Sequence, residues 1–148
     1  MSATIFTRII NGEIPGRFVW KDETCAAFLD VAPLQPGHVL VVPIQEVDRW
    51  TDADPETVAH VMGVAHTIGK AQVEAFGAAR AGLMVAGYEL PHLHVHVWPS
   101  NSLRDFDLDR KDQNPDQGEL DEAAEKIRAA LREAGHGDHV PQALAAPP

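Results

Sequence analysis

The sequence contains a single cysteine, Cys25, among its 148 residues. One cysteine cannot form an internal disulfide or a zinc site built from cysteines, so neither can cross-link this fold. No apolar run approaches the roughly 20 residues that a membrane-spanning helix requires. The first residues, MSATIFTRIINGEIPG, lack the charged start and apolar centre of a secretory signal. We therefore expect a cytoplasmic protein with no membrane partner.

Positive charge is also scarce in this chain. The 12 Lys and Arg residues are outnumbered by 22 Asp and Glu residues, which gives a formal net charge of −10. An acidic surface of this kind repels the phosphates of polynucleotides. A small anionic ligand is still compatible with it, because a single pocket can be locally neutral or positive. We expect no polynucleotide partner, whereas a mononucleotide remains a candidate.

The length and composition suit one globular domain. A hydrophobic content of 45% and a charged content of 23% are ordinary for such a domain, and the chain is long enough to bury a core. We assign residues 1–134 to a single domain that includes a C-terminal helix. Residues 135–148 are expected to form a loosely held tail.

Local patterns predict strands interspersed with helices. Apolar or alternating runs bounded by turn residues predict strands over residues 17–22, 24–30, 39–43, 81–87 and 91–98. Helical spacing predicts helices over residues 4–12 and 119–135, and one between Asp54 as N-cap and Gly77 as stop. Several strands follow one another directly, which favours an α+β fold with a mainly antiparallel sheet.

The segment ELPHLHVHVWPS, residues 89–100, has a histidine at every second position from His92 through His94 to His96. Side chains at positions i, i+2 and i+4 of a strand share one face. The three imidazoles should therefore line one surface, while the apolar residues between them face a core.

The residues alone leave three interpretations of this row open. The first is an exposed strand without a function. The second is a metal site in which Glu89 or His38 completes the ligand set. The third is nucleophilic catalysis at phosphorus, because a neutral imidazole, with an ordinary pKa of about 6.5, can form an N–P bond that water then cleaves. The flanking imidazoles would donate hydrogen bonds to the phosphate or the leaving group.

Two blocks of the sequence resemble a known family. HLHVHVW matches the pattern His-φ-His-φ-His-φ-φ, where φ is apolar, and IFTRIINGEIPGRFVWKDETCAAFLDVAPLQPGHVLVVP is similar to the N-terminal half of the same family. Together they cover most of residues 4–99 and resemble the histidine triad (HIT) superfamily of nucleotide hydrolases and transferases. The resemblance implies a HIT-like α+β fold, with a five-stranded antiparallel sheet and helices on one side. It also implies a homodimer that extends the sheet, with contacts from a helix over residues 58–76.

The resemblance further implies the roles of individual residues. His94 would be the nucleophile, while His92 and His96 would hold its ring, the phosphate and the leaving group. His38 matches a fourth histidine of the network, and Asp30 would accept hydrogen bonds from the ribose hydroxyls. The side chains that would wall the base pocket are Ile5, Phe6, Ile9, Phe28, Leu29 and Val31.

The sequence departs from the family pattern in two places. Thr4 and Thr7 stand where some bacterial relatives carry zinc-binding cysteines, so we expect neither a metal nor another cofactor. Glu89 stands beside the triad, where many members have a hydroxyl residue that contacts the phosphate. A carboxylate is unfavourable there unless it is protonated or turned away.

We therefore expect a hydrolase that cleaves purine nucleoside phosphoramidates or related nucleotidyl phosphoesters through a nucleotidyl-His94 intermediate. Two alternatives remain. One is a HIT-fold module that binds nucleotides with little or no turnover. The other is a metal-binding protein with histidine ligands.

Overall fold

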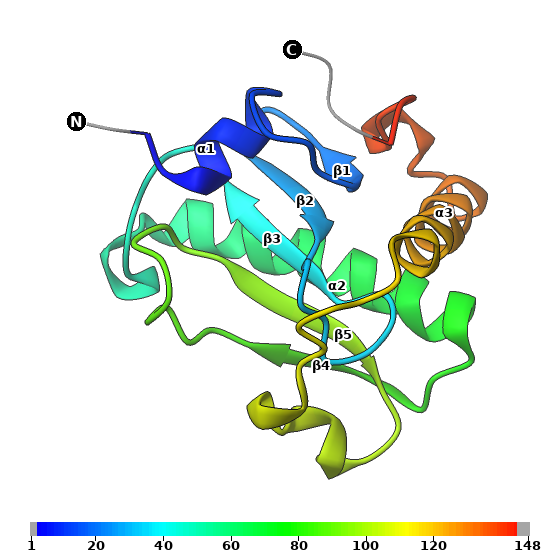
Figure 1. Cartoon of the computed structure of the whole chain (residues 1–148). Coiled ribbons are helices and arrows are strands. Elements are labelled where there is room, and N and C mark those ends of the chain that lie inside the picture. The colour runs from blue at the N-terminus through cyan, green and yellow to red at the C-terminus, as the bar shows by residue number, and fades with distance from the viewer. Residues whose placement is uncertain (1–2, 145–148) are drawn as a thin grey trace.

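The computed structural model describes residues 3–144, which form an α+β fold around one five-stranded sheet (Figure 1). The strands lie in the order β1-β2-β3-β5-β4, and every neighbouring pair is antiparallel. The fold class and the antiparallel five-stranded sheet expected from the sequence are confirmed. The strands are β1 (Phe18–Lys21), β2 (Cys25–Leu29), β3 (Val39–Pro43), β4 (Arg80–Met84) and β5 (Val95–Ser100).

The described residues contain three α-helices: α1 (Ile5–Ile10), α2 (Pro55–Phe76) and α3 (Gln117–Glu133). α2 starts and ends where the sequence predicts. Proline occupies its first position, where no backbone N–H is needed, and Gly77 ends it in the left-handed conformation with φ of 59°. Asp54 lies at the N-cap position, but its side chain accepts no capping hydrogen bond.

The two faces of the sheet are covered by different helices. Alternate strand residues such as Val41 and Val97 belong to the main core, which includes residues of α2 and α3. On the opposite face, Phe28 packs in a smaller core with Phe6 and Ile10 of α1. Figure 1 shows α2 behind the sheet and α1 in front of it. The expectation of helices on one side only is thus wrong for α1, which covers the face where the histidines lie.

β5 begins later than the histidine alternation suggests. Its first residue is Val95, so only His96 lies in the strand, while His92 and His94 lie in the segment that leads into it. The neighbouring strand β3 ends at Pro43, which has no N–H to offer to a ladder. Its carbonyl is bound by the imidazole of His92 at 2.8 Å. The ladder therefore stops before it reaches the first two histidines.

The segment from residue 135 to residue 144 differs from the loosely held tail expected from the sequence. It contains a short 3-10 helix, η4 (Gly137–His139), followed by Val140, which is buried in the main core. The guanidinium of Arg128 donates to the carbonyls of Phe18, Pro141 and Gln142. This segment is therefore fastened to both α3 and β1. Residues 145–148 of the expected tail lie outside the described part of the chain.

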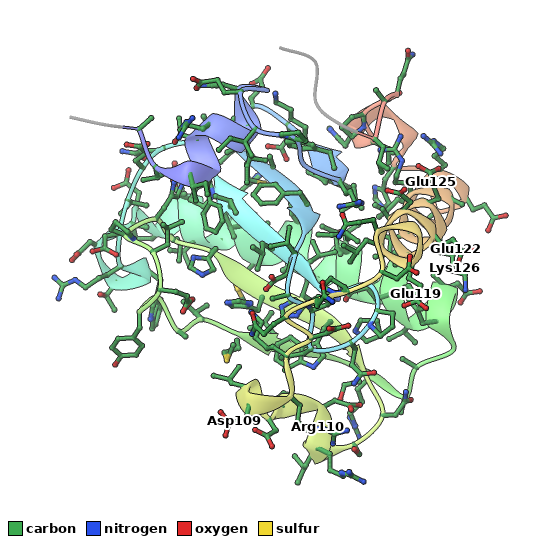
Figure 2. The ribbon with its side chains drawn as sticks, in the orientation of Figure 1. Asp109, Arg110, Glu119, Glu122, Glu125 and Lys126 are labelled. Carbon is green, nitrogen blue, oxygen red and sulfur yellow. The ribbon has the colours of Figure 1, made fainter. Side chains whose placement is uncertain are left out.

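The outer surface of α3 is strongly acidic. Glu119, Glu122 and Glu125 are exposed on this helix at the edge of the molecule, with Lys126 among them (Figure 2). None of the described helices combines the length and apolar character needed to cross a bilayer.

Candidate active site around His94

The imidazoles of the histidine row lie beneath α1. The ring centroids of His94 and His96 are 5.0 Å apart, and those of His38 and His96 are 5.1 Å apart. Phe6 of α1 meets the ring of His94 edge-on at 5.0 Å and that of His92 at 5.7 Å. All four histidines are buried, with exposed fractions of 4% or less.

The side chain of His92 is occupied by internal contacts. Its Nε2 donates to the carbonyl of Pro43, so its Nδ1 is the acceptor that faces the hydroxyl of Thr4 at 2.6 Å. Glu46 accepts from the backbone of Thr4 and the hydroxyl of Thr7, which fixes this corner of the site. Burial lowers the pKa of His92. His92 is not among the residues that line the cavity, and it contributes to the site through its main-chain carbonyl, which binds His94.

His94 is oriented by its Nδ1 atom. A carbonyl can only accept, so Nδ1 donates to the carbonyl of His92 over 2.7 Å. In the neutral ring the other nitrogen, Nε2, then carries the lone pair. This atom lies 2.8 Å from Oε1 of Glu89, whose side chain is about half exposed. Nε2, the nitrogen that the carbonyl does not hold, is thus the one that faces the carboxylate of Glu89 on the cavity wall.

His38 and His96 form a relay with a defined direction. The backbone N–H of Leu34 donates to Nδ1 of His38 at 3.0 Å, so the ring proton of His38 is on Nε2. This proton is donated to Nδ1 of His96 at 2.9 Å, which leaves the proton of His96 on its Nε2. Burial lowers the pKa of His38 to about 3 and that of His96 to about 4, so both rings are neutral near pH 7.

The relay ends in a donor that has nothing to donate to. Nε2 of His96 is buried and has no hydrogen-bond partner among the described residues, and the nearest carboxylate oxygen, on Glu89, is 3.8 Å away. An unpaired buried donor is costly, so it marks a place for a ligand acceptor. A phosphate oxygen next to His94 would be such an acceptor.

Asp30 lies on the other side of the relay. Burial alone would raise its pKa, but His38, the backbone N–H of Ala32 and the ammonium of Lys111 together lower it. Lys111 is 2.9 Å from Oδ2 of Asp30 and the N–H of Ala32 is 2.8 Å from Oδ1. Asp30 is therefore a carboxylate at neutral pH. Sequence reasoning missed Lys111, since it lies in a polar, irregular segment with no motif.

One cavity of about 270 Å³ brings most of the expected site residues together. It runs under α1 to the histidine row, and Val31, which is 72% exposed, lies at its rim. His38 and His92 are the two expected residues that do not line it. The expected residues on its wall are Ile5, Phe6, Ile9, Phe28, Leu29, Asp30, Val31, Glu89, His94 and His96.

Two groups of potential metal ligands lie within the site, Glu89–His94–His96 and Asp30–His38–His96. The direction of the relay disfavours both. In the first group the ligand nitrogen of His96 would be Nε2, and in the second that of His38 would be Nε2. Each of these atoms carries the ring proton, and a metal ligand must offer a lone pair. Either ion would need the relay to reverse.

The antiparallel sheet and the histidine row beside it define the histidine triad class of proteins. The HIT domain model matches residues 11–103, and this chain belongs to that family. The family expected from the sequence is confirmed.

Two relatives match about two thirds of this chain. An uncharacterized HIT-like protein of Methanocaldococcus jannaschii is 38% identical over 99 residues, which cover 64% of this chain and 77% of the relative. The adenylylsulfatase HINT3 of Arabidopsis thaliana is 31% identical over 118 residues, which cover 70% of this chain and 60% of the relative.

Solved structures agree with this membership. A zinc-bound histidine triad family protein of Mycobacterium smegmatis superposes with a TM-score of 0.79 at 27% identity, covering 91% of this chain and 97% of its own. A Hit-like protein of Bartonella henselae superposes with a TM-score of 0.74 at 34% identity, covering 86% of this chain and 96% of its own. A hypothetical histidine triad nucleotide-binding protein of Sulfolobus tokodaii superposes with a TM-score of 0.75 at 28% identity, covering 87% of this chain and 92% of its own.

Proposed function

We propose that this chain is a hydrolase that cleaves purine nucleoside phosphoramidates or related nucleotidyl phosphoesters by double displacement at His94. The observation that carries the proposal is the orientation of one ring. Nδ1 of His94 is committed to a carbonyl, so Nε2 is the nitrogen that can attack once its contact with Glu89 is released, and His94 lines the cavity under α1. The names of two relatives, an adenylylsulfatase and a nucleotide-binding protein, agree with a nucleotide conjugate as ligand.

The cavity offers a place for each part of a nucleotide. The purine base would lie between the apolar side chains of α1 and β2, and Asp30 would accept hydrogen bonds from the ribose hydroxyls. The α-phosphate would then lie beside Nε2 of His94, within reach of the unpaired N–H of His96. Attack by Nε2 forms an N–P bond while the bond to the leaving group breaks.

His96 would stabilise the charge that develops on the phosphoryl oxygens. Its proton is held on Nε2 by the relay from Leu34 through His38, so the donor is in place before the substrate binds. Such a preorganised donor acts most strongly in a site that excludes water, and removing one typically costs 10²–10³-fold in rate. Water would then attack the nucleotidyl-His94 intermediate and release the nucleoside monophosphate.

The test is a comparison of His94→Asn with His139→Asn, the same change at an exposed position in η4. His94→Asn should lower kcat for adenosine 5′-phosphoramidate by about 10³-fold or more, as expected for loss of a nucleophile, while His139→Asn should act like the unchanged protein. Mass spectrometry of the protein mixed with a slow substrate should find one added nucleotidyl group on the peptide that contains His94. Near-normal turnover by His94→Asn would exclude the mechanism.

A second candidate is a module that binds nucleotides with little or no turnover. It is favoured by the carboxylate of Glu89, which occupies the position next to Nε2 that the phosphorus atom would need. Calorimetry with AMP and GMP, run beside the phosphoramidase assay, separates the two candidates. Binding with no product would favour the module.

We also propose that the protein is a homodimer whose partner meets β4 and α2. β4 is an edge strand, and a cavity of about 600 Å³ lies between it and α2. Met62 and Leu83 on its wall are 37% and 42% exposed. A second copy would pair its own edge strand there and bury these apolar side chains, as edge strands with apolar neighbours favour.

A further inference from the structure

The contact between Glu89 and His94 contains a proton whose position follows from the other hydrogen bonds. Nδ1 of His94 already donates to a carbonyl, so the neutral ring would turn a lone pair towards Oε1 of Glu89 at 2.8 Å. Two acceptors at that distance repel each other. A proton therefore lies between the two atoms. Burial alone would raise the pKa of Glu89, but the hydrogen bond from His94 lowers it, so in the resting pair Glu89 accepts this proton from Nε2.

The cations around the cavity are already paired. Among its described wall residues, Lys111 binds Asp30 at 2.9 Å, and Arg17 binds Asp121 at 2.7 Å. Glu89 shares a proton with His94 at 2.8 Å, so the described wall residues offer no free cation to an anionic leaving group such as sulfate or pyrophosphate.

A second cavity of about 220 Å³ also borders His94, on the side of Tyr88. Its wall includes Asp48 and Trp50, and Arg49 on the same wall binds Asp52 at 2.8 Å. Carboxylates and aromatic faces suit an ammonium group better than an anion. The surroundings of His94 therefore favour leaving groups that depart as amines.

We propose that Glu89 is a catalytic residue that selects nucleotidyl conjugates with an amine leaving group, by carrying the proton that the departing nitrogen needs. The proposal rests on the function proposed above. It deepens that function by naming the leaving group and the group that protonates it.

In the first step, the proton passes from Nε2 of His94 to Glu89, which becomes a neutral carboxylic acid. The freed lone pair of Nε2 attacks phosphorus and the P–N bond of the substrate breaks. The electron pair of that bond goes to the departing nitrogen, which takes the proton from Glu89 and leaves as a neutral amine. The products are a nucleotidyl-imidazolium at His94 and a Glu89 carboxylate, so the total charge is unchanged.

In the second step, the Glu89 carboxylate takes a proton from the attacking water. The new P–O bond forms as the N–P bond breaks, and the electron pair of the N–P bond returns to Nε2 of His94. Glu89 then returns the proton to Nε2, and the nucleoside monophosphate leaves. The resting pair is restored without any other reactant.

Glu89 can move between the two positions that this scheme requires. The side chain of Glu89 is 55% exposed, and that of its neighbour Tyr88 is 95% exposed. Gly87, two residues before Glu89, has a φ of 82°. The described side-chain contact that rotation of Glu89 towards the leaving nitrogen breaks is the hydrogen bond to Nε2 of His94. An amide anion is a poor leaving group without a proton, whereas sulfate needs none.

The test measures kcat and KM for adenosine 5′-phosphoramidate and for adenosine 5′-phosphosulfate with Glu89→Gln. Glutamine keeps the size of the side chain but carries no transferable proton, so kcat/KM for the phosphoramidate, which reports the steps up to departure of the leaving group, should fall by about 10²-fold or more. The kcat/KM for the phosphosulfate should stay equal or rise, because sulfate leaves without a proton. The kcat for both substrates should fall, since it also contains the second step, in which Glu89 is the base. The ratio of the two kcat/KM values should therefore drop by at least about 100-fold.

Two further variants serve as controls. Glu23→Gln makes the same change at an exposed position of the β1–β2 turn and should leave both activities unchanged. Glu89→Asp keeps the proton and should retain more phosphoramidase activity than Glu89→Gln. A thermal melt of each variant shows whether the fold is intact.

The outcomes separate this inference from the proposed function. If the unchanged protein cleaves neither substrate, the proposed function fails. If it cleaves the phosphoramidate and Glu89→Gln lowers kcat/KM equally for both substrates, or for neither, then Glu89 does not select the leaving group and only this inference is overturned.

Discussion

The ammonium of Lys111 lies 2.9 Å from Oδ2 of Asp30, although 81 positions separate the two residues in the chain. Lys111 lies beyond residue 103, where the match to the HIT domain ends. The same segment is fastened beside the cavity by the N–H of Asp112, which donates to the carbonyl of Pro33 at 2.9 Å. A part of the chain outside the matched domain thus completes the wall of the proposed nucleotide site.

Lys111→Met should weaken nucleotide binding. Without the ammonium, the buried carboxylate of Asp30 loses its ion pair and its fixed orientation towards the ribose. We expect the Kd for AMP to rise about tenfold, which corresponds to about 1.4 kcal/mol, with a smaller effect on kcat. Calorimetry measures the change. Lys126→Met, on the exposed face of α3, is the control, and an equal effect of both substitutions would contradict the assignment.

Arg128→Met should destabilise the fold. Arg128 is 1% exposed, and its guanidinium serves carbonyls of β1 and of the C-terminal segment. Methionine fills similar space but leaves those carbonyls without their donor, so the free energy of unfolding should fall by about 3 kcal/mol. Urea denaturation measures it. The exposed Arg132→Met should change it by less than about 0.5 kcal/mol.

The stability of the protein should fall as the pH decreases from about 6.5 to 4. His38 and His96 have pKa values of about 3 and about 4 in the fold, below the ordinary value of 6.5. Between these limits the unfolded chain binds more protons, so acidification favours unfolding. The expected loss is on the order of a few kcal/mol in urea melts at pH 7.5, 5.5 and 4.5.

Two comparisons make this pH prediction specific. His38→Gln should flatten the dependence between pH 6.5 and 4, since one of the two buried bases is removed. Asp22, with a pKa of about 2, contributes stability that is lost only below about pH 4, as its ordinary value is 3.8. A stability that stays constant down to pH 4.5 would contradict the neutral relay.

Leu83→Glu should weaken the proposed dimer. Leu83 is 42% exposed on the edge strand β4, and a carboxylate there would lose its hydration when the partner covers it. Sedimentation equilibrium should give twice the chain mass of 16.1 kDa for the unchanged protein and a monomer for this variant at the same concentration. Leu103→Glu, at a position that is 88% exposed, is the control. A monomeric unchanged protein would refute the interface.

The sequence predicts those elements whose signals are local. The proline that opens α2 and the glycine that ends it stand within the helix sequence, and the runs that form β1, β2 and β3 alternate or are fully apolar. The histidine row was likewise visible as a pattern. Its strand starts late because Pro43 on the neighbouring strand ends the ladder, which depends on a pairing that no local window contains.

Features that depend on distant partners could not be predicted in this way. Val140 follows a polar segment. It is buried because it packs in the main core with residues of α3 and because Arg128 binds the carbonyl of the next residue, Pro141. Lys111 lies in a polar segment without a motif, and its role depends on its ion pair with Asp30, which is distant in the sequence. For Glu89, the sequence predicted a carboxylate near the phosphate, but only the structure shows that its Oε1 atom lies within hydrogen-bond distance of Nε2 of His94.

The backbone N–H of Leu34 decides which nitrogen of His96 bears hydrogen, although it touches only His38. Because this group is part of the main chain, substitutions of the Leu34 side chain leave the polarity of the two rings intact. Proline, which lacks that hydrogen, is the exception. With Leu34→Pro both tautomers could invert together, and the row would then offer a lone pair to the incoming phosphate where it now offers a proton.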